Sequence, residues 1–197
     1  MEAPSSPGTN QEYTVFISYS HSDNKEAGRQ WATWLHHSLQ TYEVPKELVG
    51  KANQRGEPVL ASLYPVFRDE EELPADSDLA GNIKWALERS RLLVVICSPR
   101  SAKSKFVEEE IRYFKELGKG DYIVPLIVDG EPNAKDAKLE CFPNALRFGA
   151  PGKDGKIDWS LATLPLGADV RIGGGPEQGW SSAGAYRADL ENNTRSF

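Results

Sequence analysis

Runs of β-branched, aliphatic and aromatic residues recur along the chain, separated by segments in which apolar residues return every three or four positions. The first pattern predicts buried strands and the second predicts amphipathic helices. Strands are expected at Tyr13–Ser20, Leu63–Phe67, Leu92–Cys97 and Tyr122–Val128. Helices are expected from Asp23 onward, over about Asp78–Ser90 and from Phe106 to Leu117.

The first of these helices is expected to begin at a capping box. Asp23 and Glu26 stand three residues apart, with Asp in place of Ser or Thr. This spacing is typical of a helix N-terminus. The polar stretch Val44–Ser62, with its two Pro and two Gly, is expected to be an inserted surface loop.

Alternation of strands and helices at this spacing predicts an α/β domain with a parallel sheet and helices on both faces. We expect the flavodoxin-like strand order 2-1-3-4-5, with Leu164–Val170 as the fifth strand. Residues 1–11 are predicted to be a disordered leader and residues 12–170 the domain itself. Residues 171–197 are predicted to be a Gly-rich connector followed by a weak C-terminal helix or tail.

The helix around Glu110 carries a charge where its pattern calls for an apolar residue. Wound at about 100° per residue from Phe106, its apolar residues fill an arc from about 340° to about 140°. Glu110 falls inside that arc, at about 40°. Glu108 and Glu109 fall outside it, at about 200° and about 300°, and are expected to face solvent.

A carboxylate that faces the core is unfavourable unless it has a partner, a raised pKa or a function. The helix dipole favours glutamates in a first turn, and Ser104 is a suitable N-cap, so the acidic run has a structural explanation as a group. That explanation does not account for the inward position. We therefore predict a functional role for Glu110.

The composition indicates a folded domain that acts without a membrane or a nucleic acid. Hydrophobic residues make up 39% of the chain, and no apolar run is long enough to span a bilayer. The first residues lack the features of a signal peptide, so a cytoplasmic location is expected. The net charge of −6, without a basic block, argues against general nucleic-acid binding. Cys97 and Cys141 lack zinc-like spacing, so we expect reduced structural cysteines and no metal site.

Ligands of such open sheets bind beyond the carboxyl ends of the strands, at the switch point of the strand order. Here that point brings together the turn after Ser18, the turn after Cys97 and the helix that carries Glu110. The three features are predicted to line one crevice.

Segments along the chain resemble, in order and at compatible spacing, the motifs of Toll/interleukin-1 receptor (TIR) domains. Phe16–Ser20 resembles the first box of the family. Val66–Asp69, with the loop through Pro74, resembles its second box and BB loop. The resemblance covers about residues 12–148 and is strongest to bacterial TIR proteins.

A third segment resembles the third-strand and αC region of the TIR domains that cleave NAD⁺. It consists of Ser98-Pro99, then Phe106, then Glu110 four residues later. Phe106 stands where Trp is usual, and the C-terminal helix is weaker than the family norm.

The resemblance implies a TIR fold and an enzyme that cleaves the bond between nicotinamide and ribose, giving ADP-ribose or a cyclised product. NAD⁺ is then the substrate, and neither a cofactor nor a metal is implied. Glu110 is implied as the catalytic carboxylate. Substrate-binding residues are implied at the other motif positions, which are Ser18, Tyr19, Phe67, Arg68, Ser98 and Phe106.

Within that set, Phe106 and Tyr19 would stack on or wall the nicotinamide, and Arg68 would meet a phosphate. For each of these three residues, packing in the core or a surface pair explains the sequence equally well.

The resemblance also implies assembly with other TIR domains, in homo-oligomers, during bacterial immune or cell-death signalling such as antiphage defence. The BB loop, with Asp69 and Pro74, would pack against a neighbouring domain and complete the active site. Trp85 is predicted to point away from the core of its helix, as residues that contact partners often do. Bacterial relatives often act with a fused or separate sensor module.

Two other functions are compatible with a sheet of this kind. A TIR scaffold that signals only by association would need no inward carboxylate at Glu110. A phospho-accepting response regulator would need an acidic cluster after the first strand and an Asp at the end of the third. Those places hold Ser18-Tyr19-Ser20 and Cys97-Ser98 instead.

Overall fold

The computed structural model describes residues 12–25, 30–53, 55–68 and 79–171. Five parallel strands form a sheet in the order β2-β1-β3-β4-β7. This order confirms the predicted flavodoxin-like sheet, because the last strand lies within the segment expected to form it. The strands are β1 (Tyr13–Ser18), β2 (Val66–Phe67), β3 (Ser90–Cys97), β4 (Ile123–Ile127) and β7 (Ala168–Asp169).

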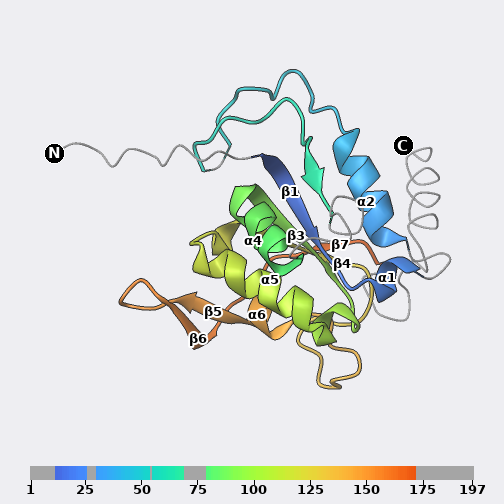
Figure 1. Cartoon of the computed structure of the whole chain (residues 1–197), viewed down its shortest axis with the longest axis vertical. Coiled ribbons are helices and arrows are strands. Elements are labelled where there is room, and N and C mark those ends of the chain that lie inside the picture. The colour runs from blue at the N-terminus through green and yellow to red at the C-terminus, as the bar shows by residue number, and fades with distance from the viewer. Residues whose placement is uncertain (1–11, 26–29, 54, 69–78, 172–197) are drawn as a thin grey trace.

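Helices cover both faces of the sheet (Figure 1). On one face lie α4 (Leu79–Arg89), α5 (Lys105–Glu116) and the short α6 (Asn144–Arg147). On the other face lies α2 (Trp31–Gln40), and α1 (Ser22–Lys25) follows the end of β1. Two short 3₁₀ turns, η1 (Ser101–Lys103) and η2 (Gly120–Tyr122), lead into α5 and β4.

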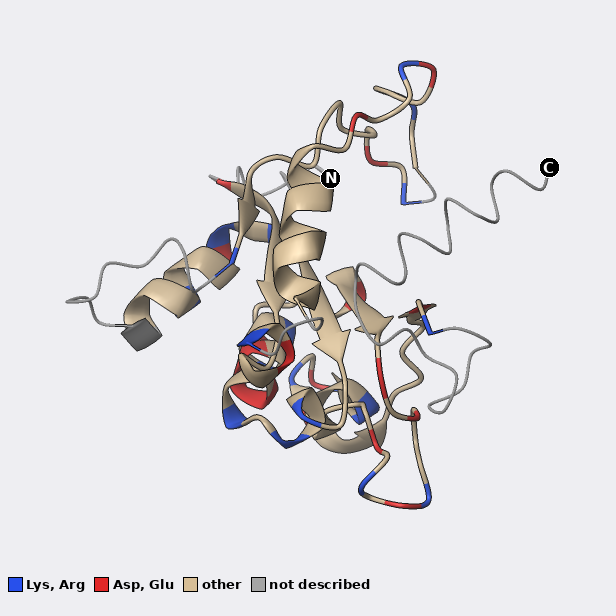
Figure 2. Cartoon of the chain, turned by 90° about the vertical axis from the view of Figure 1, so that its right-hand side faces the viewer, with Lys and Arg blue, Asp and Glu red and all other residues tan. Residues whose placement is uncertain are grey.

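The alternation of side chains along β1 divides the core into two layers. Val15 and Ile17 pack with Trp31 and Leu35 of α2, whereas Phe16 packs with the helices on the α5 face. Neither β1 nor β4 carries a charged residue (Figure 2). β1 and the second half of β4, from Pro125 to Ile127, are buried on two faces, as expected for the centre of a parallel sheet.

The start of the first helix differs from the prediction. α1 ends at Lys25 and α2 begins at Trp31, with residues 26–29 outside the described part of the chain. Asp23 lies inside α1 and is 1% exposed, so it does not serve as a solvent-facing cap. Its carboxylate is held by the turn after β3, as described below.

An antiparallel pair, β5 (Phe148–Pro151) and β6 (Ile157–Ala162), lies outside the main sheet and was not predicted. Lys115 of α5 fastens it: its Nζ donates hydrogen bonds to the carbonyl oxygens of Phe148 at 2.8 Å and Gly149 at 3.1 Å. Gly149 has φ of 91°, and a Cβ there would lie 2.5 Å from the Trp159 ring. The pair therefore requires glycine at this position.

Burial lowers the pKa of Lys115 to about 8, from 10.5. Between these two values the folded protein has released a proton that the unfolded chain still binds, so this group makes the protein more stable as pH rises. We expect the stability difference between the parent and Lys115→Met to shift in favour of the parent from about pH 8 to pH 10. Urea unfolding at several pH values measures it. Lys105→Met is an exposed control on the same helix, and a pH-independent difference for Lys115→Met would contradict the assignment.

Candidate functional site

The position of α5 is set by its N-cap. The Ser104 Oγ accepts a hydrogen bond from the backbone N–H of Val107 at 3.4 Å, which confirms the predicted cap. Val107, Ile111 and Phe114 are fully buried against the sheet. The helix therefore presents a fixed face to the end of β1.

Glu110 points into that face, as the helical periodicity predicted. Its side chain is 7% exposed, and its Oε2 accepts a hydrogen bond of 2.5 Å from the Oγ of Ser18. Ser18 ends β1 and lies two residues after Phe16, so both side chains point to the α5 side of the sheet. The bond joins two segments that are 92 residues apart in the sequence.

A second buried carboxylate, that of Asp23, also accepts a hydrogen bond from a serine at the end of a neighbouring strand. The Oγ of Ser98, directly after β3, donates a hydrogen bond to Oδ2 of Asp23, which follows β1. Arg100 lies 3.3 Å from the other carboxylate oxygen. The serine after each strand thus binds the carboxylate that follows the neighbouring strand. We call these two contacts, Ser18–Glu110 and Ser98–Asp23, the reciprocal pairs.

Glu110 borders a cavity of about 210 Å³ between α4 and α5. Phe106 lies on its rim, 71% exposed, one turn before Glu110. The volume is below the roughly 300 to 1,000 Å³ of typical small-molecule sites. The described residues therefore form a site that could enclose one ring and its attached sugar, but not a whole dinucleotide. The lining residues are Ile83, Lys84 and Leu87 of α4 and Phe106, Glu109, Glu110 and Tyr113 of α5.

A second part of the α5 wall, two turns after Phe106, is also ordered by hydrogen bonding. The Tyr113 hydroxyl donates to Glu88 at 2.5 Å, and this bond raises the pKa of Tyr113. Lys84 lies over the Tyr113 ring, with its Nζ 5.4 Å from the centroid. No sequence pattern singles out Lys84, and the helical periodicity assigns Tyr113 to the apolar face of its helix.

Of the predicted substrate-binding residues, only Phe106 lines this cavity. Ser18 is 1% exposed and contacts Glu110 through its hydrogen bond. Tyr19, one residue after Ser18, packs in the layer under α2 and is 5% exposed. Arg68 is 2% exposed and donates to Thr33 of α2 at 2.7 Å. Both residues therefore lie on the other side of the sheet.

Phe67 and Ser98 are buried as well. Phe67 is 2% exposed and packs between Phe16 and Tyr13, with ring centroids 4.9 and 5.1 Å away. The structure gives this ring a role in the core. Ser98 is fully buried and holds Asp23, so its position is that of a supporting residue.

Two of the three predicted assembly residues, Asp69 and Pro74, lie outside the described residues. Trp85 of α4 is 40% exposed, stacked under Arg89 at 4.4 Å, with an edge contact to Tyr13 at 6.2 Å. Its ring is thus directed outward, as predicted.

The expectation that Glu108 and Glu109 face solvent holds only for the second. Glu109 is exposed on the cavity rim. Glu108 accepts a hydrogen bond from Arg112 at 2.9 Å and another from the backbone N–H of Ala145 at 2.8 Å. Glu108 therefore connects α5 to α6, which the helical wheel did not reveal because α6 is far away in sequence.

Three classes of feature are not found in the described ranges. They contain no helix that is long and apolar enough to cross a membrane. They also contain no group of three or more His, Cys, Asp or Glu side chains arranged to hold a metal ion. Cys97 and Cys141 are buried free thiols, and burial raises the pKa of both, which agrees with a structural role.

The sheet order and the carboxylates at its switch point define a flavodoxin-like α/β domain with a candidate site between α4 and α5. The sequence model of the TIR domain matches residues 15–148, so the chain belongs to the TIR domain family.

Known proteins similar to the chain include an enzyme and a chain of a resistosome. The chain is 29% identical over 170 residues to the NAD(+) hydrolase ApTIR of Actinoplanes sp.. This match covers 82% of the chain and 21% of that protein. The chain thus spans about a fifth of the length of this relative. Its fold is also similar to a TIR-domain chain of the activated Roq1 resistosome that recognises the effector XopQ. That match has a TM-score of 0.44 and 21% identity, and covers 61% of this chain and 60% of the other.

The Ser98–Asp23 contact predicts a measurable contribution to stability. Asp23→Ala leaves the buried Ser98 hydroxyl without this acceptor, and we expect a loss of about 1–3 kcal/mol in the free energy of unfolding. Ser98→Ala removes the same bond, so the double variant should lose less than the sum of the two single losses. Denaturant unfolding of the four proteins measures the coupling. Strictly additive losses would show that the pair contributes no mutual stabilisation.

Proposed function

We propose that this chain cleaves the bond between nicotinamide and ribose in NAD⁺, with Glu110 as the catalytic carboxylate. The observation that carries the proposal is the buried Glu110 side chain, held by Ser18, at a cavity whose rim bears the exposed ring of Phe106. The similarity to the NAD(+) hydrolase ApTIR supports the same chemistry.

The chemistry suits a single carboxylate. Nicotinamide leaves NAD⁺ as a neutral molecule, so its departure needs no general acid, and the barrier is the cationic, oxocarbenium-like ribose. Glu110 can hold the ribose hydroxyls and stabilise that cation, since a partly dry cavity strengthens the interaction of opposite charges. Ser18 orients the carboxylate through its hydrogen bond.

The remaining cavity residues bind rather than react. The Phe106 ring stands at the cavity rim, where it can stack on the planar nicotinamide. Tyr113 of the same helix and Leu87 of α4 line the cavity beside it. Water that enters after nicotinamide leaves gives ADP-ribose, and attack by a nucleophile of the same substrate gives a cyclised product.

The small volume of the cavity favours completion of the site by assembly. About 210 Å³ cannot enclose a dinucleotide, so we propose that other copies of this domain bring further surface to NAD⁺. The exposed Trp85 ring on α4, which follows the cavity residue Lys84 directly in sequence, supports a protein contact there. A role in bacterial immune or cell-death signalling in the cytoplasm, with a sensor module, follows from the same proposal. A scaffold without catalysis is the alternative that this exposed ring also fits.

The first test is a matched pair of charge-neutralising substitutions on one helix. We expect Glu110→Gln to abolish nicotinamide release from NAD⁺, a loss of at least about a hundredfold, because the cation-stabilising charge is gone. Glu116→Gln, exposed on the same helix and away from the cavity, should retain parental activity. Chromatography of nicotinamide and nucleotide products measures both.

Two results of that test decide between the functions. Equal turnover by Glu110→Gln and the parent would remove Glu110 from catalysis. A parent that releases no nicotinamide at any concentration, while it still assembles, would favour the scaffold. Circular dichroism of each variant confirms that the fold is retained.

The second test concerns assembly. If neighbouring copies complete the site, specific activity should rise with protein concentration, because the competent assembly is a minor population when dilute. Trp85→Ala should weaken that rise, at a stability loss of at most about 1.5 kcal/mol for its contact with Tyr13. Leu48→Ala is a matched control, since Leu48 is 45% exposed and far from α4 in sequence. Activity per molecule that stays constant across the concentration series, in parent and Trp85→Ala alike, would argue for a self-sufficient monomer.

A further inference from the structure

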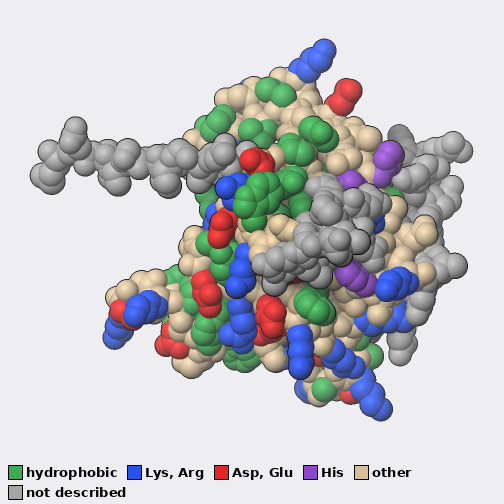
Figure 3. Space-filling view, in the orientation of Figure 1, with side chains coloured by type: hydrophobic (Ala, Val, Ile, Leu, Met, Phe, Trp, Pro, Cys, Tyr) green, Lys and Arg blue, Asp and Glu red, His purple; other side chains and the backbone are tan. Residues whose placement is uncertain are grey.

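The inserted segment between α2 and β2 is a folded arm rather than an open loop. We define the arm as residues 43–53 and 55–63. Its two halves pair at Glu43 with Ser62 and at Ala52 with Pro58, and the backbone of Val59 exchanges hydrogen bonds with Gly50 and Lys51 at 2.9 Å. Hydrophobic side chains emerge over the arm, at the top of the molecule in Figure 3.

Glu57 fixes the tip of the arm to the sheet. Its carboxylate accepts hydrogen bonds from the Tyr122 hydroxyl and from Arg91, both at 2.7 Å, and from Asn53 at 3.3 Å. These bonds, the one from Tyr122 first, lower the pKa of Glu57 to about 2. Glu57 is therefore ionised at neutral pH, and its charge is directed at Arg91.

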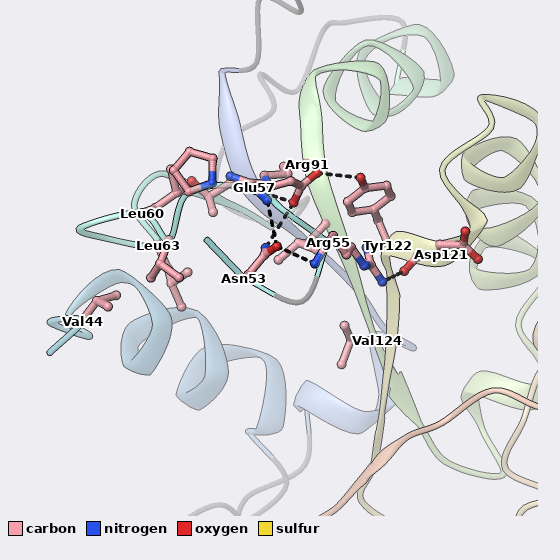
Figure 4. Close-up of a pocket in the computed structure, with 14 residues that line it drawn as sticks. Val44, Asn53, Arg55, Glu57, Leu60, Leu63, Arg91, Asp121, Tyr122 and Val124 are labelled. Carbon is pink, nitrogen blue, oxygen red and sulfur yellow. Dashed lines mark hydrogen bonds and ion pairs between the residues drawn. The ribbon is translucent and has the colours of Figure 1, made fainter. Parts of the chain in front are cut away.

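Beneath the arm lies a cavity of about 430 Å³, twice the volume of the one at Glu110 and within the usual range for small-molecule sites. Its floor comes from the amino-terminal ends of the strands, at Thr14, Leu92 and Val124. Apolar side chains of the arm, including Leu60 and Leu63, form the side wall (Figure 4). The Glu110 cavity shares none of these lining residues, since it is lined by α4 and α5 alone.

The charge in this cavity is unbalanced at Arg55. Its guanidinium lies over the Tyr122 ring, 4.4 Å from the centroid, and donates a hydrogen bond to the carbonyl oxygen of Asp121. The Asp121 carboxylate points away from it (Figure 4). Among the described residues no carboxylate lies within ion-pair distance of Arg55, whereas Arg91 is neutralised by Glu57. The cavity thus combines a largely apolar floor with one exposed guanidinium that has no carboxylate partner among the described residues.

We propose that the cavity under the arm binds a small planar carboxylate, with an apolar body on the strand ends and its carboxylate on Arg55. A guanidinium forms two parallel hydrogen bonds with a carboxylate, which sets the orientation of such a ligand. A single negative charge matches this one guanidinium, whereas a dianion would leave one charge unpaired beside Glu57. The hydrogen bonds of Glu57 hold the arm in place before the ligand arrives, which reduces the ordering that binding requires. This site is separate from the proposed NAD⁺ cleavage.

Calorimetric titration with cinnamate, a planar aromatic carboxylate, tests the proposal on the intact chain. We expect binding to one site at millimolar concentration or below. Arg55→Gln should raise the dissociation constant of cinnamate by about tenfold or more, because charge-assisted hydrogen bonds are lost. Arg55→Lys keeps the positive charge but cannot form two parallel hydrogen bonds. Its dissociation constant for cinnamate should lie between those of the parent and Arg55→Gln.

Matched ligands and variants locate the site. Cinnamamide has the shape of cinnamate without its charge, so it should bind the parent more weakly than cinnamate does. Its affinity should be the same for the parent and for Arg55→Gln. Lys51→Gln changes an exposed cation on the arm that does not line the cavity, and it should leave the cinnamate affinity unchanged. Val124→Phe fills the floor at a side chain that is 39% exposed, so it should abolish binding without unfolding the chain.

Three outcomes would overturn the proposal. They are the absence of any heat or melting shift with millimolar cinnamate, an equal affinity of the parent and Arg55→Gln, and full binding by Val124→Phe at an unchanged melting temperature. None of these measurements depends on NAD⁺ turnover. Failure of the cinnamate-binding proposal can therefore be distinguished from failure of the proposed role of Glu110.

Discussion

The candidate site depends on an exchange of hydrogen bonds between two neighbouring parallel strands. Ser18 at the end of β1 binds the carboxylate that follows β3, and Ser98 after β3 binds the carboxylate that follows β1. The segment that follows β1 is thereby bonded to the end of β3, and the helix that follows β3 is bonded to the end of β1. Because both carboxylates are nearly inaccessible to water, neither would be tolerated there without such a donor. The arrangement fixes α5, and with it the positions of Glu110 and Phe106.

The sequence was sufficient for the sheet order and for the inward direction of Glu110, since both follow from the periodicity of apolar residues. The position of Tyr19 did not follow from the sequence, because the motif resemblance grouped it with Ser18. Tyr19 comes directly after β1, and only the packed structure shows that its ring lies in the layer under α2.

Other features needed the tertiary structure. Asp23 has the spacing of a helix cap, and only the approach of Ser98 from a distant turn shows why it is buried. Glu108 lies on the polar side of its helix, yet it binds α6. The β5–β6 pair was missed because its short strands are separated by glycine and depend on Lys115 of a remote helix. In each case the deciding contact joins segments that no local pattern connects.

β1 runs from the cavity under the arm to the serine that holds Glu110. Thr14 lies at the floor under the arm, and Ser18 lies beside Glu110. The two residues are about 13 Å apart at about 3.3 Å per residue. The three residues between them are at most 1% exposed and packed from both faces, so β1 can move only together with its neighbours. Events at one end can be felt at the other only through displacement of the whole sheet, and any such influence must be equal in both directions.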